Sequence, residues 1–182
     1  PLKIHSNPSN YSTFDGKYRL IDFNLSNIAN ANIKSLFMVF NEGETQSVFD
    51  HVGGGKEWNL DGIQNRFFIH TYQNFVRQDD NNSSYYDVLI DYLRKSKSEY
   101  AVYMGSKILC NIDLKTLLHI HQARNCDMTV VYKKIDLEKT NSDDILLTLD
   151  DEHTISEKTF AKDATTQSEV NLCADIFIIK TH

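Results

Sequence analysis

Two charged stretches carry the side chains best suited to chemistry. The first holds Gly16, Lys17, Arg19 and Asp22. Lys17 and Arg19 could meet a phosphate or a carboxylate, and Gly16 permits a tight turn near such an anion. Asp22 is a good N-cap acceptor, so we expect a loop that leads into a helix and binds a ligand at the helix N-terminus. The alternative is that Lys17 is a surface turn residue and Arg19 pairs with Asp22.

The second stretch contains Lys107 and Asp113 and follows the apolar run Tyr100–Met104. That run predicts a buried strand, and open α/β sheets bind ligands beyond the carboxyl ends of their strands. Lys107 therefore stands where chemistry is expected, but its ammonium group cannot be an oxygen ligand for a metal ion. Asp113 is interpreted as the N-cap of a helix that ends at Asn125, in preference to a catalytic acid.

The histidines and the glycine triplet do not indicate a metal or phosphate site. His51 has no second histidine at helical spacing, and His119 and His121 point in different directions on a helix. Gly53–Gly55 follows a short helix expected over Ser47–Val52, and the Lys-Ser/Thr pair of a P-loop is absent. The glycines are interpreted as a helix end, and His51 as a structural residue.

Alternating helical and strand patterns predict an α/β fold, with a mixed, mostly parallel sheet and helices on both faces. Residues 3–12 are polar and show no strand pattern, so we expect the first strand of the sheet to be missing and residues to be absent before Pro1. A helix beginning near Ser84 is expected to bury the face formed by Tyr86, Leu89, Ile90 and Leu93. The expected strands are Leu36–Phe40, Arg66–His70, Tyr100–Met104, Met128–Lys133, Ile145–Leu149, Thr154–Phe160 and Leu172–Ile179.

Length and composition set further bounds. The 182 residues fit one domain over residues 1–182, and the net charge of −6 argues against nucleic-acid binding. Three widely spaced cysteines indicate neither a disulfide framework nor a zinc site, so a reducing cytoplasm is expected. The sequence contains no apolar run long enough for a membrane helix. Small molecules or other protein chains are the expected partners.

The sequence from Phe14 to Asn27, FDGKYRLIDFNLSN, resembles the signature of bacterial glucose-1-phosphate adenylyltransferases, the ADP-glucose pyrophosphorylases of glycogen synthesis. This resemblance implies a Rossmann-like nucleotidyltransferase fold. It also implies a reaction of ATP with glucose 1-phosphate that yields ADP-glucose and pyrophosphate, with Mg²⁺ neutralising the phosphate charge. The C-terminal left-handed β-helix domain of the family is absent from residues 1–182, which predicts a partial nucleotidyltransferase domain.

Three further segments are similar to the divergent GlgD-type branch of this family: Ser47–Val52, Gly55–Leu60 and Met128–Lys134. In the catalytic branch the position of Lys107 is an aspartate that holds Mg²⁺. The resemblance therefore implies a non-catalytic, regulatory subunit without catalytic or metal-binding residues, partnered by a catalytic GlgC-type subunit or by itself. Two alternatives remain: a slow enzyme whose metal is held by Asp113 or Asp175, and a sensor that binds nucleotide or glucose 1-phosphate without reaction.

Overall fold

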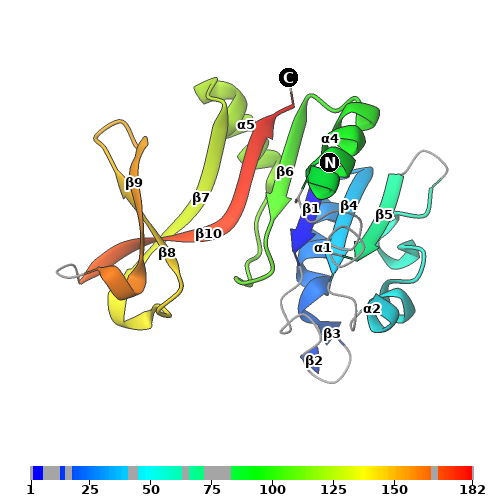
Figure 1. Cartoon of the computed structure of the whole chain (residues 1–182), viewed down its shortest axis with the longest axis horizontal. Coiled ribbons are helices and arrows are strands. Elements are labelled where there is room, and N and C mark those ends of the chain that lie inside the picture. The colour runs from blue at the N-terminus through cyan, green and yellow to red at the C-terminus, as the bar shows by residue number, and fades with distance from the viewer. Residues whose placement is uncertain are drawn as a thin grey trace. The chain divides into compact units, whose positions relative to one another are not determined.

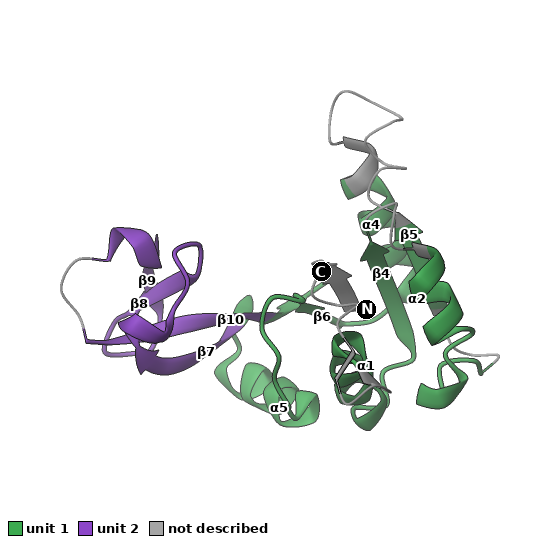
Figure 2. Cartoon of the chain, turned by 90° about the horizontal axis from the view of Figure 1, so that it is seen from below, with its two compact units in different colours: residues 1–129, 177–182 green, residues 130–176 purple. Residues whose placement is uncertain are grey.

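The computed structural model describes residues 2–5, 13–14, 18–40, 45–62, 66–71, 83–164 and 168–181. The chain forms two compact units. The first comprises residues 1–129 and 177–182, and the second comprises residues 130–176. Figure 2 distinguishes the two units by colour.

The first unit is built on a parallel sheet. Its strands are β1 (Leu2–His5), β4 (Ser35–Phe40), β5 (Arg66–Thr71) and β6 (Tyr100–Met104), in the spatial order β5-β4-β1-β6 (Figure 1). The end of β10 (Glu169–Lys180) lies next to β6. Leu2 is in register with Leu36 on one side and with Val102 on the other. This arrangement confirms the predicted α/β fold with a mostly parallel sheet.

The expectation that the first strand is missing is wrong. Strand β1 occupies the centre of the sheet and pairs in parallel with both β4 and β6. The sequence Leu2-Lys3-Ile4-His5 alternates apolar and polar residues, but four residues are too short for this pattern to stand out. The neighbouring strands come from distant parts of the sequence, so the pairing that defines β1 is not visible locally.

Helices pack on both faces of this sheet, as predicted (Figure 2). Helix α4 (Ser83–Ser96) covers the face that carries Phe37 and Val39. Tyr100 lies on the opposite face and meets His121 of α5 (Leu114–Arg124) edge to face, with the ring centroids 5.5 Å apart. The remaining helices of the first unit are α1 (Leu20–Asn30), α2 (Thr45–Val52) and the 3₁₀ helix η3 (Lys56–Trp58).

The buried face of α4 differs from the prediction. Val88, Leu89 and Tyr92 pack against Phe37, whereas Tyr86 and Ile90 are 54% and 43% exposed. Both sets of residues satisfy helical spacing and share Leu89, so the apolar pattern alone could not select between two adjacent faces. Phe37 is stacked on His70 and tilted against Tyr92, and these aromatic contacts fix the true face.

The glycines after α2 end that helix, as predicted. Gly53 donates its N–H to the Phe49 carbonyl and has a φ of 54°. Gly55 has a φ of 80°, and a Cβ at this position would lie 2.7 Å from the Cβ of Leu60. Gly55 therefore needs to be glycine for both its backbone conformation and its close packing.

The second unit is an antiparallel arrangement of strands. Strand β8 (Ile145–Leu149) pairs with β9 (Ile155–Phe160) on one side and with β10 on the other. Strand β7 (Met128–Asp136) also pairs with β10, and its first two residues belong to the first unit. Leu146, Ala161 and Val170 form the buried core of the second unit. The hairpin predicted from β8 to β9 is confirmed.

Four short elements complete the description. The first unit also contains β2 (Thr13–Phe14) and β3 (Tyr18–Arg19), and the second also contains η4 (Leu137–Lys139) and η5 (Ala161–Asp163).

Candidate functional site

Helix α1 begins at Leu20, three residues earlier than an N-cap at Asp22 would predict. The extended residue before the helix is Arg19, with φ −107° and ψ 159°. Asp22 stands in the first turn, where its Oδ2 accepts the Arg19 backbone N–H at 2.9 Å. Assigning Asp22 as the N-cap was therefore wrong. Aspartate is favoured both at the N-cap and two to three residues beyond it, so its presence does not fix where the helix starts.

The side chains of Asp22 and Arg19 both connect α1 to α2. Asp22 Oδ1 lies 2.7 Å from His51 Nε2, and the two side chains are 11% and 21% exposed. Arg19 Nη1 donates to the backbone carbonyl and to the hydroxyl of Ser47, at 2.8 Å each. His51 thus has the structural contact that the sequence suggested, and the Arg19 guanidinium contacts Ser47, not the carboxylate of Asp22.

Of the four residues predicted to bind a ligand, the structure brings two together. Arg19 and Asp22 lie side by side at the start of α1, where both also hold α2. Gly16 and Lys17 lie outside the described residues. Ligand binding by this set stays a prediction.

Two buried asparagines of α1 hold the loop that follows β6. Asn24 Nδ2 donates to the Gly105 carbonyl at 3.2 Å. Asn27 donates to the Cys110 carbonyl at 2.9 Å and accepts the Ile112 backbone N–H at 3.3 Å. Asn24 and Asn27 are 5% and 3% exposed, so these bonds satisfy polar groups that have little access to water. We call Asn24 and Asn27 the asparagine anchor.

The asparagine anchor was not predicted from the sequence, although the sequence holds one signal of it. Asn24 and Asn27 are three residues apart and therefore lie on one side of the helix. Ile21, Leu25 and Ile28 bracket them, and these apolar side chains are 2%, 0% and 0% exposed. Polar residues on the buried side of an amphipathic helix must find hydrogen-bond partners.

Lys107 lies on the anchored loop, beyond the carboxyl end of β6, and its side chain is exposed. An ammonium group cannot coordinate a divalent cation. Among the described residues, no three His, Cys, Asp or Glu side chains come together as a metal site. The absence of a metal site at this loop stays a prediction.

Asp113 caps α5, as predicted. Its Oδ1 accepts the backbone N–H groups of Lys115 and Thr116 at 2.9 and 3.3 Å, and its Oδ2 accepts the Thr116 hydroxyl at 2.8 Å. These hydrogen bonds, first the one from the Thr116 side chain, hold the pKa of Asp113 below its ordinary value. Asn125 ends the helix with a φ of 47°, again as predicted. Asp175, the other carboxylate considered for a metal, belongs to the second unit.

The two histidines of α5 occupy different environments. His119 is exposed, whereas His121 is fully buried, and its Nδ1 lies 2.8 Å from the Thr129 hydroxyl. Its Nε2 is buried without a hydrogen-bond partner among the described residues. Burial lowers the pKa of His121, and the nearby positive charge of Lys180 lowers it further. The folded chain therefore favours the neutral imidazole.

A pH dependence of stability follows from His121. The unfolded chain takes up a proton near the ordinary pKa, whereas the folded chain resists it, so the free energy of unfolding falls as pH drops below about 6.5. We expect a His121→Gln variant to lose less stability than the unchanged chain when the pH is lowered from about 7.5 to 5.5. Urea denaturation at each pH measures this difference. His119→Gln is the matched control and is expected to keep the original slope; equal slopes for all three proteins would contradict the assignment.

Comparison with known proteins places the chain in a family. Residues 6–142 match the nucleotidyl transferase family. The chain is 37% identical over 122 residues to the glycogen biosynthesis protein GlgD of Bacillus subtilis (strain 168), an alignment that covers 66% of this chain and 35% of that protein. It is 32% identical over 121 residues to the glycogen biosynthesis protein GlgD of Geobacillus stearothermophilus, covering 65% of this chain and 35% of that protein.

The chain spans about a third of the length of these two curated relatives. In the described part of the chain, none of the helices has the length and apolar character needed to cross a membrane. The resemblance to the GlgD-type branch, predicted from the sequence, is confirmed by both relatives.

Proposed function

The chain belongs to the nucleotidyl transferase family, and from this premise we propose that it is the nucleotidyltransferase part of a GlgD-type protein of glycogen biosynthesis, acting as a non-catalytic, regulatory subunit. The names of its two relatives support a role in glycogen biosynthesis. The lysine on the loop after β6 supports a role without catalysis. Lys107 on that loop is the observation that carries the second part of the proposal.

Transfer of a nucleotidyl group needs positive charge around the phosphates, which Mg²⁺ supplies when oxygen ligands hold it. From the resemblance, we expect the metal-binding aspartate of the catalytic branch to correspond to residue 107, where this chain has lysine. The asparagine anchor binds the backbone at Gly105 and Cys110, on either side of this residue. The loop is therefore held at both sides, while the side chain that it presents is a cation.

The slow-enzyme alternative requires another carboxylate to hold the metal. Asp113 is the nearest candidate in sequence, but its two oxygens accept three hydrogen bonds from Lys115 and Thr116. Recruiting this carboxylate to a metal would remove the cap of α5. The capping geometry of Asp113 thus favours the non-catalytic proposal.

We further propose that the partner is a catalytic GlgC-type subunit, with self-association as the other form of assembly. ATP and glucose 1-phosphate are the ligands that the family reaction implies for that subunit. The net charge of −6 disfavours nucleic acid as a partner. In this role, the chain changes the activity of its partner without transferring a nucleotidyl group itself.

The first test is an activity assay of the purified chain with ATP, glucose 1-phosphate and Mg²⁺. We expect negligible formation of ADP-glucose and pyrophosphate, because residue 107 is a cation where the metal requires an oxygen ligand. A Lys107→Met variant is the matched control, since it removes the charge without adding an oxygen ligand, and it should be equally inactive. Robust Mg²⁺-dependent turnover by the unchanged chain would overturn the proposal.

The second test concerns the partner. The chain is mixed with a catalytic GlgC-type subunit, the mixture is separated by size, and ADP-glucose synthesis is compared with and without the chain. We expect the two proteins to elute together and the rate or the apparent substrate affinity of the catalytic subunit to change. Separate elution with unchanged kinetics would contradict the regulatory role.

A further inference from the structure

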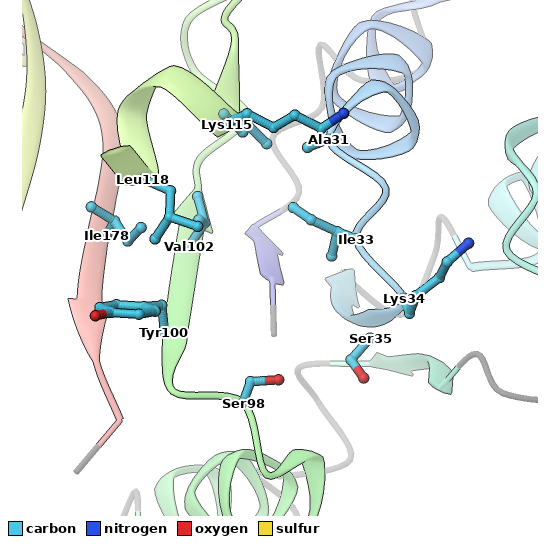
Figure 3. A pocket seen from close by; sticks show the side chains of 11 residues that line it. Ala31, Ile33, Lys34, Ser35, Ser98, Tyr100, Val102, Lys115, Leu118 and Ile178 are labelled. Carbon is cyan, nitrogen blue, oxygen red and sulfur yellow. The ribbon is translucent and has the colours of Figure 1, made fainter. Parts of the chain in front are cut away.

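We draw no further inference here: the strongest candidate, the cavity lined in part by Ser35, Val102 and Lys115 at the amino end of β1, between β4 and β6 (Figure 3), carries nothing because the side chains of β1 lie outside the described residues and nothing in the structure shows what fills it.

Discussion

An Asn27→Leu variant is expected to unfold about 2–4 kcal/mol more easily than the unchanged chain. Leucine has the same branched side-chain shape but cannot replace the two hydrogen bonds to the loop after β6. The Cys110 carbonyl and the Ile112 N–H then lose their partner, and each unsatisfied buried group costs about 1–3 kcal/mol. Urea denaturation followed by circular dichroism measures the difference.

The matched control for this variant is Asn30→Leu. Asn30 lies on the same helix and is exposed, so its replacement should change stability by less than about 0.5 kcal/mol. Asn27→Asp is a second comparison, since it keeps the acceptor for Ile112 and removes the donor to Cys110. If Asn27→Leu and Asn30→Leu lost equal stability, the asparagine anchor would not hold the loop in solution.

The second large effect is expected from Phe37→Ala, with a loss of about 3–5 kcal/mol. Phe37 is 1% exposed and lies between His70 and Tyr92, with ring centroids 4.7 and 4.9 Å away. Removing its ring leaves a cavity between β4 and α4, because the surrounding backbone can close only partly. Thermal and urea denaturation both report the loss.

Phe68→Ala provides a matched comparison for Phe37→Ala. Phe68 occupies the same face of the neighbouring strand β5 and also contacts the Tyr92 ring, at 5.6 Å, but it is 45% exposed. Its removal should cost about 1 kcal/mol or less, since water already covers much of the ring. A similar loss for both variants would mean that burial does not determine the contribution of these two rings.

Helix caps and strands that depend on residues close in the sequence were predictable. Asp113 and Asn125 were assigned correctly as the ends of α5, because capping depends on residues within one helical turn. The strand predicted before Lys107 was also confirmed, so the sequence alone was enough to position this residue beyond the carboxyl end of β6. Asp22 was misplaced by the same local reasoning, since aspartate suits more than one position near a helix start.

Contacts between distant segments were not predictable. Strand β1 was missed because its hydrogen bonds come from β4 and β6, which follow much later in the chain. The partners of Asn27 are the Cys110 carbonyl and the Ile112 N–H, 83 and 85 residues away. His51 was expected to be structural, but nothing near it in the sequence indicated that Asp22 would be its partner.

The asparagine anchor also determines which substitutions the loop after β6 can accept. Every contact that Asn24 and Asn27 make to this loop ends on a main-chain atom: the carbonyls of Gly105 and Cys110 and the N–H of Ile112. Residues of any type supply such carbonyls, and all except proline supply such an N–H. An exchange of an acidic for a basic residue at position 107 therefore leaves these three hydrogen bonds intact, as the proposed non-catalytic role requires of this loop.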